Sequence, residues 1–341
     1  MYTRTPAFIQ RYEQNPVLSC KDVPYETGLV FNAGVAKWDN QYVMIFRNDL
    51  ADMQTQTLHQ GHTNLGIAWS PDGKQWEVPD TPFLSQEQAR EKCRAFHEPR
   101  FGDQEIKRVY DPRITVLGDA AYLCFAADTP HGICGGVADL GDFDRFDVLS
   151  LSAPDNRNMV LFPEKINGKW ARLERPFPIY GRPGPENFDI WYSESPDGIH
   201  WGRNRLVLGS EEVPYVNNKI GPAAPPVKTE KGWLTTFHGV YKDEETPLNA
   251  WHENWFKTYY AGLMLLDLER PWKVIGMMKE PLLVPETEHE LKGFRGSVIF
   301  PGGMISEPDG TVNIYYGAAD TVECLANAHV DDLLSQCTPL A

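Results

Sequence analysis

The chain has 341 residues, of which 42% are hydrophobic, and a formal net charge of −15 at pH 7. This length allows two domains, although all-β chains of this size often form one, and the apolar content is enough for a sizeable core. The negative charge argues against nucleic acid and anionic membranes as partners, but a local cluster of arginine and lysine could still bind a phosphate.

Signals for localisation are sparse along the chain. Residues 1–16 contain no apolar stretch typical of a signal peptide, and no run of about 18 apolar residues predicts a membrane span. The six cysteines are scattered without a CxxC pair, so we expect free thiols and a cytoplasmic protein, although Cys124 and Cys134 could be cross-strand neighbours.

Short apolar or alternating runs predict β-strands along most of the chain. In chain order these are residues 29–36, 42–47, 65–69, 113–118, 121–126, 188–195, 232–240, 260–268, 297–303 and 311–318. Helical periodicity is nearly absent, and only residues 85–96 and 329–337 could form short helices. The segments 50–63, 78–106 and 243–258 are longer than ordinary turns, and the last could be a lid, a subunit contact or an ordinary packed loop.

Two internal repeats indicate the architecture. SPDGKQW (70–76) recurs as SPDGIHW (195–201), and YLCFAADT (122–129) resembles YYGAADT (315–321). Although any two hairpins can share a Pro-Asp-Gly turn, two echoes favour the blades of an all-β propeller, in which each small sheet packs on the next. With no linker visible, we expect one domain over residues 1–341, ending in a helical tail at about 326–341.

Known catalytic motifs are missing from the sequence. It contains no phosphate-binding loop, no dinucleotide fingerprint and no nucleophile elbow, and His59 and His62 lack a third ligand nearby, so we expect no metal site. The remaining candidates are polar residues at strand ends, which a propeller would bring together: Asn32, Arg47, Asp111, Arg157, Asn158, Arg175, Lys219, His238, Tyr259 and Asp320. Each has a structural alternative; Asp111 and Arg113 could form an ion pair, Asp320 could cap a turn, and His238 could be a core residue.

Six segments resemble the signature segments of glycoside hydrolase family 130, the inverting β-mannoside phosphorylases. They are YDPRIT, NRNMVLFPEKINGKWARLERP, KIGPAAPP, FHGVYK, LLDLERPWKVIG and YYGAADT. The resemblance implies a five-bladed β-propeller, usually a homo-oligomer, that needs no cofactor and uses inorganic phosphate as co-substrate. The implied reaction cleaves a β-mannoside, most often β-1,4-linked to glucose, mannose or N-acetylglucosamine, and gives α-mannose 1-phosphate and the released sugar. A β-1,2 linkage stays open.

The resemblance also implies residue roles. Asp111 matches the single catalytic acid, which acts through the 3-hydroxyl of mannose. The positions that match phosphate ligands are Arg157, Arg175, Lys219, His238 and Tyr259, where the match could slip by one to Tyr260; the positions that match mannose ligands are Asn32, Arg47, Asn158 and Asp320. Residues 243–257 and GFRGSVIF (293–300) depart from the family pattern, and we expect both near the acceptor sugar.

Physical chemistry separates the possible functions. An inverting hydrolase needs two carboxylates about 6.5–9.5 Å apart, one of them to activate water. A phosphorylase needs one acid and a cationic cradle, because phosphate is already an anionic nucleophile. Asp111 would have to keep its proton, so we expect a raised pKa beside Val109, Tyr110 and Ile114. A hydrolase that uses Asp320 as the second carboxylate, and a non-catalytic sugar-binding propeller, are the alternatives.

Overall fold

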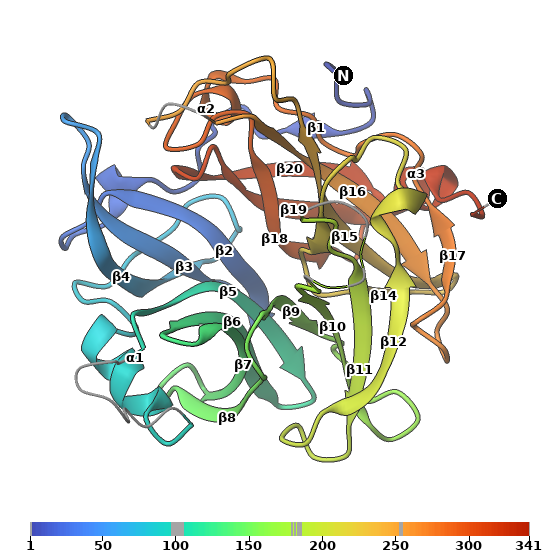
Figure 1. Cartoon of the computed structure of the whole chain (residues 1–341), viewed down its shortest axis with the longest axis horizontal. Coiled ribbons are helices and arrows are strands. Elements are labelled where there is room, and N and C mark those ends of the chain that lie inside the picture. Colours follow the sequence, from blue (N-terminus) through green and yellow to red (C-terminus); the bar gives the residue numbers. More distant parts are fainter. Residues whose placement is uncertain are drawn as a thin grey trace.

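The computed structural model describes residues 2–96, 106–178, 180, 182, 186–251 and 255–340. In these ranges, five small antiparallel sheets are arranged as a ring (Figure 1). The structure is therefore the five-bladed β-propeller that the family resemblance implies.

Each blade extends outward from an inner strand near the axis. In that order the first two blades are β2 (Leu29–Trp38), β3 (Gln41–Asp52) and β4 (Thr57–Ser70), then β5 (Arg108–Leu117), β6 (Ala120–Thr129), β7 (Gly132–Gly141) and β8 (Asp147–Leu151). The third is β9 (Asn156–Leu161), β10 (Trp170–Pro176), β11 (Ile190–Ser195) and β12 (Gly202–Leu208). The fourth is β13 (Ile220–Pro222), β15 (Gly232–Lys242), β16 (Lys257–Leu266) and β17 (Val274–Met277), with β14 (Val227–Thr229) beside β15. The fifth is β18 (Ile299–Ser306), β19 (Thr311–Ala318), β20 (Val322–His329) and β1 (Gln10–Arg11).

The ring is closed by the two ends of the chain. Strand β1, near the N-terminus, pairs antiparallel with β20, and an isolated bridge joins Leu18 to Glu323 (Figure 1). The N-terminal strand thus completes the blade that the C-terminal strands begin. Backbone hydrogen bonds between the two ends of the chain therefore close the ring.

The hydrophobic core is divided among the blade interfaces. Five clusters lie one at each interface, for example around Val43 and Leu123 between blades one and two, and around Phe46 and Tyr315 between blades one and five. Each sheet can therefore bury both of its faces only because it has a neighbour on either side, which is the physical basis for the expectation drawn from the repeats.

Both internal repeats occupy corresponding places in their blades. The SPDG turns follow β4 and β11, each the third strand of its blade, and in both the serine Oγ accepts a hydrogen bond of 2.9 Å from the glycine amide, Gly73 or Gly198. The second echo falls on β6 and β19, each the second strand from the axis. The echoes are therefore repeats of structure as well as of sequence.

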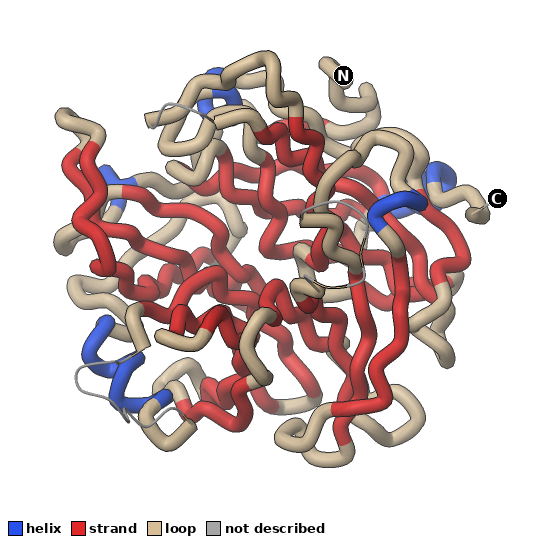
Figure 2. Tube along the Cα trace, in the orientation of Figure 1, coloured by secondary structure: helices blue, strands red, loops and turns tan. Residues whose placement is uncertain are grey.

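Helices are short and lie at the edges of the sheets (Figure 2). Helix α1 (Gln86–Cys93) begins at a Ser85 capping box, and α3 (Val330–Gln336) follows β20, so both expected helices are confirmed. The sequence did not predict α2 (Glu288–Leu291) or the 3₁₀ turns at Cys20–Asp22 and Ser210–Glu212. No helix in the described part of the chain has the length and apolarity needed to cross a bilayer.

One expectation about local structure is wrong, and several strands were not predicted. Residues 50–63 are not a loop, because β3 and β4 continue through most of this segment as a long hairpin. The glycine-rich strand β7 was missed, since glycine is rare in strands. A Cβ on Gly136 would meet the Phe125 ring at 2.2 Å, so the close packing of β6 on β7 requires glycine at this position.

The six cysteines are free thiols, and Cys124 lies opposite Val137 rather than Cys134.

Candidate active site

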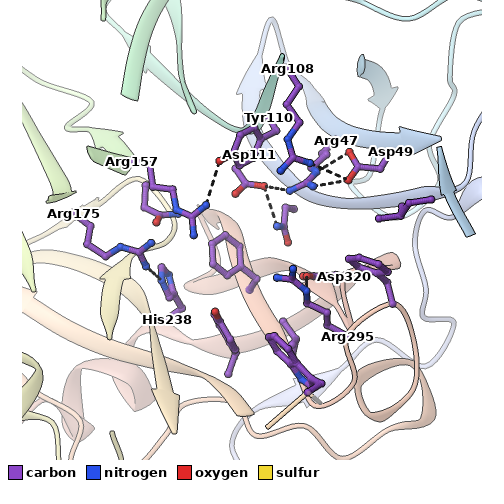
Figure 3. Close-up of a pocket in the computed structure, with 18 residues that line it drawn as sticks. Arg47, Asp49, Arg108, Tyr110, Asp111, Arg157, Arg175, His238, Arg295 and Asp320 are labelled. Carbon is purple, nitrogen blue, oxygen red and sulfur yellow. Dashed lines mark hydrogen bonds and ion pairs between the residues drawn. The ribbon is translucent and has the colours of Figure 1, made fainter. Parts of the chain in front are cut away.

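One pocket of about 330 Å³ is lined by side chains from all five blades (Figure 3). It brings together nine of the ten candidate residues: Asn32, Arg47, Asp111, Arg157, Asn158, Arg175, His238, Tyr259 and Asp320. Residues that are up to 288 positions apart in sequence therefore share one cavity, as convergence of the inner strands at the axis requires.

Three of these residues occupy equivalent bulges in successive inner strands. Asn32 in β2, Asp111 in β5 and Asn158 in β9 have left-handed φ angles of 53°, 53° and 56°. At each of these points the inner strand carries one more residue than its partner strand. Asparagine and aspartate tolerate this conformation better than most residues, and a bulge re-aims a side chain. The bulges explain why polar groups from buried strands line the pocket.

Asp111 accepts two hydrogen bonds at one oxygen. Its Oδ1 lies 3.1 Å from Asn32 Nδ2 and 3.1 Å from Arg47 Nη1. Asp49 holds Arg47 in place, because its carboxylate accepts hydrogen bonds from Arg47 Nε, at 2.9 Å, and from Arg47 Nη2. The same carboxylate accepts a hydrogen bond of 2.8 Å from the Thr63 hydroxyl. Asp49 therefore fixes the guanidinium so that its third nitrogen is directed at Asp111.

The charges around Asp111 contradict the expected rise in its pKa. Burial raises the pKa of this carboxyl, but the positive charges of Arg47, Arg113 and Arg157 outweigh burial, and the pKa lies below its ordinary value. Burial instead raises the pKa of Asp320, which also lines the pocket. The expectation failed because it considered only neighbours along the chain, whereas Arg47 and Arg157 come from other blades.

Arg157, Arg175 and His238 form a cationic cluster on the other side of Asp111 from Asp320 (Figure 3). Arg157 and Arg175 are directly opposite in the β9–β10 pair, and Arg175 Nη1 lies 2.8 Å from His238 Nε2. Burial and the Arg175 charge hold the pKa of His238 far below its ordinary value, so its ring is neutral and Nε2 accepts this bond, which places the proton on Nδ1.

The cluster has donors without acceptors. His238 Nδ1 and the Nε atoms of Arg157 and Arg175 are buried and have no hydrogen-bond partner among the described residues. Two of these donors belong to charged arginines, and neither arginine is ion-paired to a carboxylate among the described residues; an anion such as phosphate would satisfy this arrangement.

Tyr259 lies beside this cluster, and the adjacent Tyr260 does not. The Tyr259 ring stacks on His238 with centroids 6.0 Å apart, and it lines the pocket. Tyr260 is buried in the core cluster between blades three and four. The structure therefore favours Tyr259 over a slip of one residue.

Lys219 is the candidate that does not line the pocket. Its Nζ lies 3.6 Å from Glu186 Oε1, and the same carboxylate receives Lys257 at 2.6 Å. Burial, with the charges of Arg175 and Lys257 adding to it, lowers the pKa of Lys219 to about 6. The charge of Arg175 therefore reaches Lys219, but the ion-pair partner of Lys219 is Glu186.

Arg113 is not the ion-pair partner of Asp111 that the sequence suggested as an alternative. Its buried guanidinium donates to the carbonyls of Asn32, Pro112, Ala223 and Pro301, at 2.6–3.1 Å. These carbonyls belong to four different blades. Arg113 therefore ties the inner strands together beneath the pocket.

The sequence missed several pocket residues. Asp49, Arg108 and Tyr110 lie within three positions of Arg47 or Asp111, so strand alternation could have identified Asp49. Trp255 and Arg295 come from the two segments that depart from the family pattern, and no local signal places them here.

Comparisons with known proteins agree with this geometry. A sequence model of the glycoside hydrolase family 130, described as beta-1,4-mannooligosaccharide phosphorylase, matches residues 8–338. A beta-1,4-mannooligosaccharide phosphorylase from Ruminococcus albus is 31% identical over 96% of this chain and 90% of that protein. A beta-1,2-mannobiose phosphorylase from Listeria innocua is 28% identical over 96% of this chain and 98% of that protein. The solved structure of a Listeria innocua beta-1,2-mannobiose phosphorylase with beta-1,2-mannobiose is similar with a TM-score of 0.76 at 27% identity, covering 96% of this chain and 98% of that one.

Proposed function

The chain belongs to glycoside hydrolase family 130, and we propose that it cleaves a β-1,4-linked mannoside with inorganic phosphate. It is an enzyme of the glycoside phosphorylase type, as its relatives are. The proposed reaction inverts the anomeric carbon and gives α-D-mannose 1-phosphate and the released sugar.

The observation that carries this proposal is a group of buried hydrogen-bond donors that have no partner. Arg157, Arg175 and His238 present buried donors that lack acceptors among the described residues. A hydrolase would gain nothing from such a cluster, because water needs a base and not a cation. An anionic nucleophile bound there would satisfy the donors and offset the repulsion between the two arginines.

In the proposed mechanism Asp111 is the general acid. Mannose is held by Asn32, Arg47, Asn158 and Asp320, and phosphate by Arg157, Arg175, His238 and Tyr259. Lys219 would join the phosphate ligands by leaving Glu186, which Lys257 continues to neutralise.

Phosphate would also supply the condition that Asp111 needs in order to be protonated. The Arg157 charge is one of the causes that lower the pKa of Asp111. A phosphate dianion beside Arg157 offsets that charge, so the pKa of Asp111 rises when the nucleophile is present. The acid would therefore become active only in the complex with phosphate.

The linkage is proposed as β-1,4 because the description of the matching family model and the Ruminococcus albus relative, at 31% identity, both name that linkage. A β-1,2 linkage is the second candidate, because the Listeria innocua relative acts on beta-1,2-mannobiose and has a closely similar fold.

The test is to incubate the enzyme with β-1,4- and β-1,2-linked mannobiose and with β-1,4-mannosyl-glucose, each with and without phosphate. We expect α-mannose 1-phosphate to form only with phosphate, and fastest from a β-1,4 substrate. Equal cleavage in phosphate-free buffer would overturn the proposal in favour of hydrolysis, with Asp320 as the second carboxylate. Faster phosphorolysis of the β-1,2 substrate would overturn the linkage only.

A further inference from the structure

The two segments that depart from the family pattern pair with each other. A backbone bridge joins Ala250 to Arg295, and the Gly296 amide donates to Asn249 O at 2.7 Å. A Cβ on Gly296 would meet that oxygen at 2.1 Å, so this approach requires glycine. The Trp255 indole also donates to Gly296 O, at 2.8 Å. The two loops thus form one wall of the pocket, which we name the 295 wall (residues 249–251, 255 and 293–298).

A column of stacked side chains connects this wall to the cationic cluster. Tyr259 stacks on His238 at one face, with centroids 6.0 Å apart, and on Trp255 with centroids 6.0 Å apart. The Arg295 guanidinium lies 5.0 Å from the centroid of Trp255. Arg295 and His238 are therefore at opposite ends of the column, and they lie on different sides of the pocket in Figure 3.

The guanidinium of Arg295 is restrained by its neighbours, but its N–H groups have no hydrogen-bond partner among the described residues. It lies against two aromatic rings, Trp255 and, at 5.4 Å, Phe294. Its only ion pair within the described residues is a long one, 3.9 Å from Nε to Asp320 Oδ2, and in that part of the chain its side chain donates no hydrogen bond. Its side chain is 46% exposed, whereas Arg175 at the other end of the pocket is 1% exposed.

Inversion sets where the leaving sugar must lie. The phosphate oxygen attacks the anomeric carbon from the face opposite the departing oxygen, so the leaving sugar occupies the side of the pocket away from the phosphate. If phosphate lies at Arg157, Arg175 and His238, that side is formed by Asp320, Arg295 and the aromatic residues of the 295 wall. Leu58, from the long hairpin, packs in the same hydrophobic cluster as Phe294 and borders the same side.

We propose that Arg295 binds hydroxyl oxygens of the leaving-group sugar and so determines which acceptor the enzyme uses. The inference rests on the proposed phosphorylase function. The rings of Trp255 and Phe294 restrain the guanidinium, whose N–H groups can donate to a neutral hexose, because a hexose offers several hydroxyl acceptors.

The test measures synthesis from mannose 1-phosphate with glucose, mannose and N-acetylglucosamine as acceptors. We compare the wild type with Arg295→Ala and Arg295→Lys, and with Arg270→Ala as a control at an exposed arginine paired to Asp267 on a distant turn. For Arg295→Ala we expect the KM for the best acceptor to rise about 10- to 100-fold, as for loss of a charge-assisted hydrogen bond. The KM for mannose 1-phosphate should change less than about 3-fold, and Arg295→Lys should recover part of the affinity but rank the acceptors differently.

Each outcome decides one question. An unchanged acceptor KM in Arg295→Ala, with a wild type that is active, overturns the inference but leaves the proposed function standing. An equal rise in the KM for mannose 1-phosphate also overturns it, because Arg295 would then act on mannose through Asp320. A wild type that turns over none of the acceptors, and phosphorolyses no mannoside, refutes the proposed function and this inference with it.

Discussion

Replacing Arg175 by methionine should stabilise the empty protein while removing phosphate binding. Arg175 is buried, lies directly opposite Arg157 in the sheet, and has no carboxylate partner among the described residues. Like charges directly opposite in an antiparallel pair destabilise the sheet. Methionine keeps most of the length of the side chain and removes the charge.

The size of the expected stability gain follows from the pKa of Arg175. Burial, with the Arg157 charge adding to it, lowers the pKa of Arg175 from 12.5 to about 9. A difference of about 3.5 between the unfolded and folded values costs about 5 kcal/mol of stability at any pH below 9, and the cost disappears only as the pH rises toward 12.5. The substitution also loses the His238 hydrogen bond and the cation–π contact with Phe177, together about 2–3 kcal/mol. We therefore expect a net gain of about 2 kcal/mol.

The assay is equilibrium urea unfolding at pH 7 in phosphate-free buffer. The matched control is Arg172→Met on the same strand, where the buried arginine is paired with Glu174 at 2.8 Å. Removing Arg172 leaves the buried charge of Glu174 without its ion-pair partner, although the Asn156 amide still donates to it, and should cost about 3–5 kcal/mol. Phosphate at about 100 times its Kd should stabilise the wild type by about 2.7 kcal/mol and leave Arg175→Met unchanged.

If Arg175→Met is less stable than the wild type without phosphate, the charge of Arg175 is compensated in the free protein. The view of the cluster as an unfilled anion site would then be wrong.

Three further predictions concern the acid, the lysine and the axis. Asp111→Asn should lower turnover about 10²- to 10⁴-fold while the phosphate Kd from calorimetry changes little, and full activity would exclude this residue as the acid. Because burial lowers the pKa of Lys219 to about 6, phosphate binding at pH 7.5 should take up close to one proton more in the wild type than in Lys219→Met, and this difference should shrink below pH 6. Calorimetry in buffers of different ionisation enthalpy measures this uptake, and a Lys219→Met variant with the same uptake would exclude Lys219 as its source. Arg113→Met should lower the unfolding free energy by about 3–5 kcal/mol, since four buried carbonyls lose their donor; a loss under about 1 kcal/mol in urea unfolding would show that other donors replace it.

The propeller architecture could be predicted from the sequence because the turn motifs that indicate it are local. The SPDG turns form their own hydrogen bonds within four residues, so the same letters give the same turn wherever they occur. The closing strand β1 was not readable, since only two residues pair with β20 and they have no apolar alternation.

Most of the candidate residues that line the pocket were named from the sequence, but the electrostatics of the pocket were not predicted. The family resemblance selected Asp111 and the residues around it, and nine of the ten lie in one pocket. The lowered pKa of Asp111 and the left-handed bulges depend on contacts between blades, which no stretch of sequence contains. The same is true of Arg295, which comes into position only because residues 249–251 pair with the loop that carries it.

The position of Arg113 has a consequence for the order of events during turnover. Its guanidinium lies 5.2 Å from the ring of Phe300, which lines the pocket, and donates to carbonyls of four blades, so we expect it to close the central axis behind the pocket. Ligands would then come and go through the side of the pocket where the half-exposed Arg295 lies, past the leaving sugar. Phosphate must enter before the mannoside covers it, and the sugar phosphate must be the last product to depart, so steady-state kinetics should show a compulsory sequence of binding and release.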